Sequence, residues 1–365
     1  MKLNLIAPIN NLGYGYTGLH ITDELIKAGH DVALFPIGKP ECHFRHQENI
    51  QKALDNANTW DNYAPCVRLW HQHDMSMFVG KGLHVGFPIF ELDTLTDKEI
   101  WHLQSCDELF VCSEWAREVC YNNFSTPNPP IGVVPLGVEP EIFEPTVSRR
   151  KPTIFLNVGK WEKRKGHDIL IDAFNHAFTP DDNVELWMMC DNPFLNEEQT
   201  REWRDKYGFS PLGNKVRFIP RVEADTQVAE IMQQADCGVF PSRGEGWNLE
   251  ALEMLSCGKQ VIATDYSAHT EFLNEDNTHL VPMQGIEPAK DDIWFHGQGN
   301  WGKFTTGMHR VNEITGTSML EMVIAMRYVH ELKQKGELGL NVEGIETAEK
   351  LTWANTANKI IQFLS

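Results

Sequence analysis

The 365-residue chain lacks several features that would assign it to a specialised class of protein. No apolar run approaches the ~20 residues that a membrane-spanning helix needs. The apolar run at the N-terminus is too short for a signal peptide and predicts a first buried strand. The eight cysteines include no Cys-x-x-Cys pair, which argues against a zinc or disulfide framework and favours reduced core thiols in a cytoplasmic protein. Low-complexity tracts and sequence repeats are also absent.

Positive charge is scarce as well. Lys and Arg number 32 against 51 Asp and Glu, for a formal net charge of −19. This balance disfavours bulk attraction to nucleic acid or to an anionic membrane, although it is compatible with a local basic patch. The hydrophobic content of 42% and charged content of 23% are ordinary for a globular protein. Because the chain is long for a single core, we expect two domains.

Strand and helix patterns alternate from the start of the chain. Residues 2–8 predict a strand, a glycine-rich turn follows at 11–18, and a helix is expected at about 17–28. A second strand at 31–36 completes the first unit of a doubly wound parallel sheet. Further strands are expected at 67–71, 84–87, 109–112 and 131–134.

A proline-rich segment at 135–145 interrupts this alternation, and a polar stretch follows it, so we place a domain boundary at 147/148. The alternation then restarts with a strand at 153–158, a turn at 159–166 and an amphipathic helix at 167–178. Later elements are expected as strands at 184–189, 216–219, 237–241 and 260–264, and as helices near 317–335 and 345–364.

The predicted fold class is α/β, with two Rossmann-like αβα domains facing each other across a cleft. The first domain would span 1–147 and the second 148–340, and a helix in 341–365 would cross back to the first domain. Residues 285–312, which are polar and contain Gly and Trp, are expected to form an ordered excursion over the second domain, with no assigned function.

The segment 241–258 combines two carboxylates with a glycine turn. Glu245 lies in the turn, and Glu253 follows inside a short helix that Gly258 is expected to end. Carboxylates accept hydrogen bonds from sugar hydroxyls, and a helix N-terminus behind a glycine turn can bind phosphate. The segment therefore predicts ligands for both ends of a nucleotide sugar. The other predicted donor-binding residues here are Ser242, Gly246, Trp247, Asn248 and Leu249.

A basic loop at 159–166 directly follows a predicted strand of the second domain. Its four cations would neutralise a diphosphate, and the alternative is a solvated basic turn. We select Lys160 and Lys165 as diphosphate ligands and expect Lys163 and Arg164 to face water. The sequence contains no Asp-x-Asp pair, so we expect no metal and no cofactor. Lysines, helix termini and backbone amides would then stabilise the charge of a leaving diphosphate.

The first domain offers weaker candidates. Gly13, Gly15 and Gly18 fit the Gly-x-Gly-x-x-Gly spacing, but the acidic ribose partner of a dinucleotide-binding dehydrogenase is missing after the second strand. His73, in the sequence His-Gln-His-Asp, would bind metal, act as a base or line a pocket; no third His or Cys ligand lies nearby. Glu91 follows a strand, at the edge where ligands collect in open α/β sheets.

With these residues in hand, the chain resembles the retaining GT-B glycosyltransferases of family four over most of its length, most strongly from 154 to 273. Glu245-x7-Glu253 is similar to the paired-glutamate motif of that family, and residues 257–264 are similar to the segment that follows it. The basic loop resembles the diphosphate loop of the family. The segment 134–145 resembles its interdomain linker, and residues 240–242 resemble the strand end before its glutamates.

The resemblance implies a metal-independent, retaining transfer of a hexose from a nucleoside diphosphate sugar to an acceptor hydroxyl. It implies that Glu253 binds the ribose, that Glu245 contacts the donor sugar, and that the region of Val222 lies near the base. It also implies that Lys160 and Lys165 hold the diphosphate, which Gly15 approaches from the first domain, and that the last helix, with Trp353, crosses back.

Two departures from the family pattern affect this interpretation. Many relatives have Arg at the position of Lys160, and many have His where this chain has Phe87-Pro88. Glu91 and His73 are therefore our candidates for the acceptor side. Alternative hypotheses are an epimerase of GT-B shape, which would act on the donor without an acceptor, and a degenerate transferase that acts as a binding protein. We expect a saccharide acceptor ahead of a modified nucleic acid or a lipid.

Overall fold

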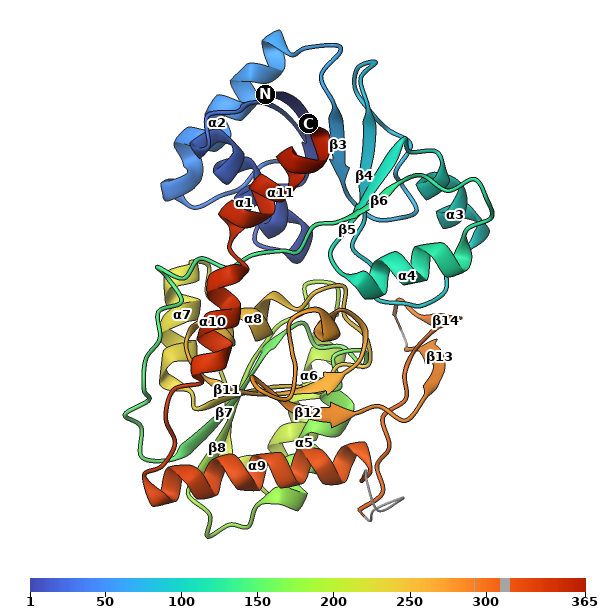
Figure 1. Cartoon of the computed structure of the whole chain (residues 1–365). Helices are drawn as coiled ribbons and strands as arrows, with labels where there is room; N and C mark the ends of the chain where they lie inside the picture. The colour runs from blue at the N-terminus through green and yellow to red at the C-terminus, as the bar shows by residue number, and fades with distance from the viewer. Residues whose placement is uncertain (292, 309–315) are drawn as a thin grey trace. The chain divides into compact units, whose positions relative to one another are not determined.

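The computed structural model describes residues 1–291, 293–308 and 316–365 (Figure 1). The described chain forms two compact units. The first comprises Met1–Val138 with Lys350–Ser365, and the second comprises Glu139–Glu349. Each unit is built on its own six-stranded parallel sheet. Both are therefore Rossmann-like, which confirms the predicted α/β fold class.

The sheet of the first unit has the strand order β2-β1-β3-β4-β5-β6. Its strands are β1 (Lys2–Ala7), β2 (Asp31–Pro36), β3 (Cys66–Leu69), β4 (His84–Phe87), β5 (Glu108–Val111) and β6 (Ile131–Val133). The helices are α1 (Gly13–Lys27), α2 (Gln47–Asn56), α3 (Asp97–Gln104), α4 (Glu114–Asn123) and α11 (Trp353–Leu364). Strand β1 is buried over almost its whole length and β3 over all of it, as parallel strands covered on both faces are.

Helix α1 begins at Gly13, earlier than the predicted start at about 17, so the predicted glycine turn is wrong. A Cβ atom on Gly15 would lie 2.2 Å from Asn10 Oδ1, and one on Gly18 would lie 2.3 Å from the carbonyl oxygen of Pro8. These glycines therefore allow the helix to pack closely on the loop that leaves β1. The Asn10 side chain accepts a hydrogen bond of 2.9 Å from the Leu12 N–H just before the helix.

The helix predicted near 345–364 is two helices, α10 (Val342–Lys350) and α11. Thr352 separates them because it caps the N-terminus of α11, where its Oγ1 accepts a hydrogen bond of 3.2 Å from the Asn355 N–H. Helix α11 belongs to the first unit, whereas α10 belongs to the second up to Glu349. The chain therefore returns to the first unit at 350, later than the predicted 341.

Helix α11 packs on α1 within the first unit. The indole of Trp353 stacks on the imidazole of His20, with ring centroids 5.0 Å apart and planes 11° apart. Both side chains are buried. The buried side chain of Trp353 therefore packs α11 against α1 in the core of the first unit.

The sheet of the second unit has the order β12-β11-β10-β7-β8-β9. Its strands are β7 (Thr153–Gly159), β8 (Val184–Cys190), β9 (Val216–Phe218), β10 (Cys237–Phe240), β11 (Gln260–Asp265) and β12 (His279–Pro282). Its other helices are α5 (His167–Ala177), α6 (Glu197–Gly208), α7 (Asp225–Gln234), α8 (Leu249–Ser256) and α9 (Ser318–Lys335). Strands β7 to β11 follow the predicted positions closely, whereas β12 was not predicted. Phe155, Leu170, Phe174 and Leu186 are among the fully buried residues of the core between sheet and helices.

The boundary between the units differs from the predicted 147/148. The second unit begins at Glu139, because the proline-rich segment packs on it. The Ser256 hydroxyl donates to the carbonyl oxygen of Phe143 at 2.8 Å, and the Thr146 N–H donates to that of Cys257 at 3.1 Å.

An antiparallel hairpin forms much of the predicted excursion at 285–312. Its strands are β13 (Ile286–Lys290) and β14 (His296–Gly302), while residues 292 and 309–312 lie outside the described part. The hairpin is joined to the segment that carries the glutamates. The carbonyl oxygen of Arg243 accepts a hydrogen bond of 2.7 Å from the Gly302 N–H, and the Arg243 guanidinium lies 5.8 Å from the Trp301 ring centroid.

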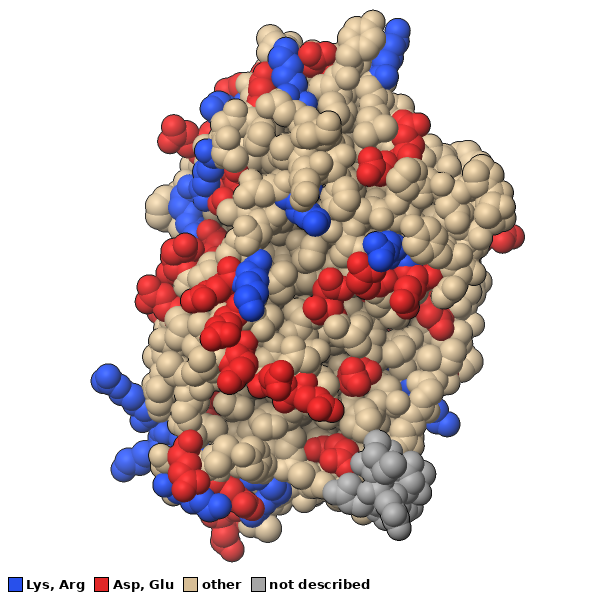
Figure 2. All heavy atoms as spheres, viewed as in Figure 1, with Lys and Arg blue, Asp and Glu red and all other residues tan. Residues whose placement is uncertain are grey.

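The cysteines, the helices and the surface charge of the described chain agree with its amino-acid composition. All eight cysteines are free thiols, and seven of them are buried, as predicted for core thiols. Across the described residues, the helices are too short or too polar to cross a lipid bilayer. Acidic side chains are spread widely over the face seen in Figure 2, and the described residues form no broad basic patch there.

Candidate active site

The basic loop between β7 and α5 is held rigidly by its own buried side chains. Trp161 is fully buried, and its indole is stacked 5.8 Å from that of Trp203. The Glu162 N–H donates to His167 Nδ1 at 3.0 Å, so His167 Nε2 carries the proton and donates to Asn157 Oδ1 at 2.8 Å. Burial, assisted by the charge of Lys165, lowers the pKa of His167 to about 3. The imidazole is therefore neutral at pH 7.

The four cations of this loop have different environments. Lys163 is exposed, as predicted, and Lys160 is 38% exposed with its Nζ 3.1 Å from Glu162 Oε1. Arg164 and Lys165 are buried. The prediction that Arg164 faces water is wrong. Its planar guanidinium lies between two buried carboxylates, a geometry that arginine suits better than lysine.

Arg164 and Lys165 converge on Glu245. Arg164 Nη1 donates to Glu245 Oε2 at 2.7 Å, and its Nη2 donates to Glu162 Oε2 at 2.9 Å. Lys165 Nζ lies 3.1 Å from Glu245 Oε1, which also accepts a hydrogen bond of 2.7 Å from the Ser242 hydroxyl. Three residues of the basic loop, Glu162, Arg164 and Lys165, and two of the segment 241–258 thus form one buried polar cluster.

The charges of this cluster determine the protonation state of Glu245. Burial alone would raise the pKa of this carboxyl, but Arg164 and Lys165 outweigh burial and hold the pKa well below its usual range. For Lys165 the neighbouring carboxylates likewise outweigh burial, and they raise its pKa. Glu245 is therefore an ionised acceptor rather than a proton donor.

The backbone around Glu245 is fixed by polar residues that follow β11, which sequence reasoning missed. The Glu245 N–H donates to Ser267 Oγ at 2.8 Å. The side chain of Asn248 donates to His269 Nε2 at 2.8 Å, and His269 Nδ1 donates to the carbonyl oxygen of Thr264 at 2.9 Å. Ser267 and His269 directly follow a strand, at the carboxyl edge of the sheet. This position is the signal that could have indicated them as site residues.

Arg243 was also missed, although it directly precedes the glycine turn. Its guanidinium forms a bidentate pair with Asp168 of α5, at 2.7 and 2.8 Å, and donates to the carbonyl oxygen of Lys163 at 2.6 Å. Arg243 therefore joins the basic loop and α5 to the glutamate segment.

Helix α8 begins at this cluster. Asn248, with φ of 84°, is its N-cap, and the side-chain oxygen accepts a hydrogen bond of 3.2 Å from the Ala251 N–H. Gly246 and Trp247 are buried, and the indole of Trp247 packs 4.9 Å from the ring of Phe272. The N–H groups of Leu249 and Glu250 precede the first intrahelical hydrogen bond and lie at the positive end of the helix dipole.

Glu253 lies one turn further along α8 and has a different environment from Glu245. It is only 8% exposed, and across the described residues its carboxylate makes no hydrogen bond or ion pair. Burial, together with the carboxylates of Glu250, Asp225 and Glu139, raises the pKa of Glu253 well above its usual value. A buried carboxyl that lacks a protein partner is stabilised when a hydroxyl ligand supplies its hydrogen bonds.

In the first unit, the three predicted residues are grouped around Tyr14. Gly15 is the next residue in α1, and Glu91 is close enough to contribute to a raised pKa of Tyr14, which is caused chiefly by burial. Strand β3 has ended before His73, which is exposed. The His73 ring nevertheless stacks on His71 at 5.3 Å, and the His71 ring lies 4.6 Å from Tyr14.

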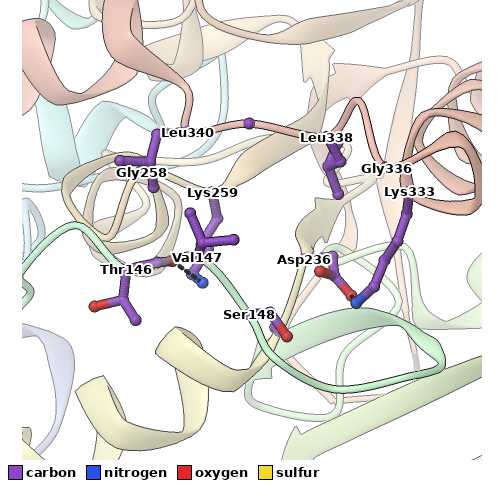
Figure 3. Close-up of a pocket in the computed structure, with 12 residues that line it drawn as sticks. Thr146, Val147, Ser148, Asp236, Gly258, Lys259, Lys333, Gly336, Leu338 and Leu340 are labelled. Carbon is purple, nitrogen blue, oxygen red and sulfur yellow. Dashed lines mark hydrogen bonds and ion pairs between the residues drawn. The ribbon is translucent and has the colours of Figure 1, made fainter.

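A cavity of about 260 Å³ lies at the opposite edge of the second sheet (Figure 3). Asp236 and Lys259, which line it, directly precede β10 and β11. Lys259 Nζ donates to the carbonyl oxygens of Thr146 and Gln233 at 2.5 and 2.7 Å, and Lys333 Nζ pairs with Asp236 at 2.5 Å. Since these charges already have protein partners, this cavity is a poor candidate for the anionic donor.

Comparison with known proteins finds relatives of the part of the chain that contains this cluster. The model of the family described as Glycosyl transferases group 1 matches residues 152–291, which include Lys165, Glu245 and Glu253. A putative glycosyltransferase of Sulfolobus islandicus filamentous virus is 20% identical over 309 residues, covering 83% of this chain and 79% of its own. Mannosylfructose-phosphate synthase of Agrobacterium fabrum is 21% identical over 323 residues, covering 78% and 70%.

Solved structures share the fold over the whole chain. Sucrose-phosphate synthase of Thermosynechococcus elongatus matches with a TM-score of 0.72 at 17% identity, covering 100% of this chain and 98% of its own. HepE of Anabaena in complex with UDP-glucose matches with a TM-score of 0.70 at 15% identity, covering 100% and 99%. The fold is thus that of the GT-B proteins. With the group 1 domain in residues 152–291, the protein is a glycosyltransferase.

Proposed function

We propose that this protein is a retaining, metal-independent hexosyltransferase that uses a nucleoside diphosphate sugar. The observation that carries the proposal is the arrangement of ligands on α8. The first turn of the helix lies beside the buried ammonium of Lys165. The carboxyl of Glu253, which has no partner in the described part of the chain, follows one turn later. One helical turn is about 5.4 Å, a spacing suited to a diphosphate at one end and ribose hydroxyls at the other.

The role that we propose for each residue of the site is based on the charge of its side chain. Lys165, Lys160 and the first amides of α8 bind the diphosphate, and Glu253 accepts from the ribose. Glu245 holds Arg164 and Lys165 in place and contacts the donor sugar. HepE, whose structure is a complex with UDP-glucose, is a precedent for such a donor in this fold.

The proposed chemical step is front-face displacement. The acceptor oxygen forms a bond to the anomeric carbon, the bond from that carbon to the diphosphate oxygen breaks, and the departing phosphate takes the acceptor proton. Because Glu245 is ionised and already paired, the protein supplies positioning and charge stabilisation rather than a proton. Gly15, Glu91 and His73 remain candidates for the first-unit side of the reaction.

Thermal unfolding with a panel of UDP, GDP, ADP and their hexose conjugates tests the donor and the metal together. We expect at least one nucleotide to raise the melting temperature by the same amount with EDTA and with Mg²⁺, because lysines and amides supply the positive charge. The absence of a shift from every nucleotide, or a shift that EDTA abolishes, contradicts the proposal.

Glu253→Gln tests the ribose contact. We expect the unliganded variant to be more stable by about 1 kcal/mol, because a buried carboxyl without a partner becomes a neutral amide. The raised pKa means that wild-type stability falls as the pH rises above the unfolded value of about 4.3, and the variant should lack this loss. Nucleotide affinity should nevertheless fall about tenfold.

Calorimetric titration and urea unfolding check both parts of this prediction. Glu349→Gln, an exposed glutamate of α10, is the control and should change neither quantity. Unchanged nucleotide affinity in Glu253→Gln would contradict the proposal that Glu253 binds the ribose.

A further inference from the structure

Two exposed aromatic rings stand beside the basic loop. Phe194, in the loop after β8, is 51% exposed, and Trp294, between β13 and β14, is 48% exposed. Their centroids are 5.2 Å apart with planes at 87°, and Lys160 Nζ lies 5.6 Å from the Phe194 centroid. We call Lys160, Phe194 and Trp294 the aromatic shelf.

Side-chain oxygens fix the backbone at both rings. Asn192 Oδ1 accepts a hydrogen bond of 3.0 Å from the Phe194 N–H, while its amide group donates to the carbonyl oxygen of Trp161 at 2.9 Å. Asp291 Oδ1 accepts a hydrogen bond of 2.7 Å from the Trp294 N–H and one of 2.9 Å from the Phe295 N–H. Exposed rings whose backbone is held in this way lose little freedom on binding a ligand.

The aromatic shelf is continuous with the sugar end of the proposed site. Lys160 pairs with Glu162, Glu162 with Arg164, and Arg164 with Glu245, at N–O distances of 3.1, 2.9 and 2.7 Å. This chain of ion pairs therefore links the shelf to Glu245, the glutamate assigned to the donor sugar.

We infer that the aromatic shelf binds a hexopyranose ring of the acceptor, which makes the acceptor a saccharide. The apolar C–H face of a pyranose packs on an aromatic ring, while its hydroxyls remain free to bond to polar groups at the rim. Lys160 offers an ammonium, and the indole N–H of Trp294 has no partner among the described residues. This inference rests on the proposed function, in which Lys160 binds the leaving diphosphate, so the two rings of the shelf would hold the acceptor beside the leaving group.

Saturation-transfer NMR tests the shelf with methyl α-glycosides of glucose, mannose and galactose as probes. We expect at least one glycoside to bind the wild type, and Phe194→Ala and Trp294→Ala to bind it about tenfold more weakly. Trp294→Phe, which keeps a ring, should retain most of the affinity. Phe209→Ala, at a ring that is 85% exposed elsewhere in this unit, is the matched control and should bind like the wild type.

The nucleotide panel, run on the same preparations, separates this inference from the proposed function. If a nucleotide binds but no glycoside does, or if glycoside affinity survives in Phe194→Ala/Trp294→Ala, the shelf inference fails and the proposed function stands. If the double variant loses nucleotide affinity and keeps glycoside affinity, the shelf serves the nucleotide, and the inference is overturned. If glycosides bind through the shelf and no nucleotide binds, the proposed function fails.

Discussion

Replacement of Glu245 by glutamine should lower turnover about 100- to 1,000-fold while the donor still binds within a fewfold of the wild-type affinity. Glutamine keeps the size of the side chain but removes the charge that pairs with Arg164 and Lys165. Lys165 keeps its own charge and remains available to the diphosphate. The cations, however, lose the carboxylate that positions them for the transition state.

Initial rates at saturating donor, together with calorimetric titration of the nucleotide, measure these two effects separately. We also expect the variant to unfold at a lower temperature, because breaking a buried ion pair typically costs about 3–5 kcal/mol. Rates should therefore be measured well below its unfolding transition. Glu185→Gln, which removes the half-buried carboxylate that pairs with Arg217, controls for the loss of one negative charge. Turnover within a fewfold of wild type would contradict the role of Glu245.

Lys165→Met should weaken nucleoside diphosphate binding about 100-fold. The ammonium is buried beside the start of α8, where its charge is poorly screened, and methionine replaces it with an apolar group of similar length. Calorimetric titration with the nucleotide identified by the thermal panel measures the loss.

Lys163→Met is the matched control for this prediction. Lys163 lies two positions earlier in the same loop and is exposed, so its replacement should leave affinity almost unchanged. Equal losses in the two variants would point to general attraction by the loop. An unchanged affinity in Lys165→Met would show that Lys165 does not bind the diphosphate.

The carboxyl edge of the second sheet explains why these effects are concentrated in so few residues. Strand β10 leads to Ser242 and Glu245, and the neighbouring strand β7 leads to the basic loop. Because adjacent parallel strands end at the same edge, side chains far apart in the sequence are brought within hydrogen-bond distance. Arg164 and Glu245, separated by 81 positions, meet in this way.

Much of this arrangement was predictable from local patterns. Alternating strands and helices, ended by glycines and prolines, indicated two parallel-sheet units, and the structure has both. The spacing of Glu245 and Glu253 indicated one residue in the turn and one in a helix, which is where they lie. The period of the hydrophobic residues, the positions of glycine and proline, and the spacing of the glutamates are properties of residues close together in the sequence. The sequence by itself therefore determines them.

Only the tertiary structure decided which charges meet. Arg164 and Lys163 are adjacent in the sequence, yet one is buried against Glu245 and the other is exposed. Likewise, nothing local indicated that Trp294 would meet Phe194, or that His269 would hold Asn248. Burial and pairing depend on the register of the strands and on the path of the loops between them, and these are set by the packing of the whole unit.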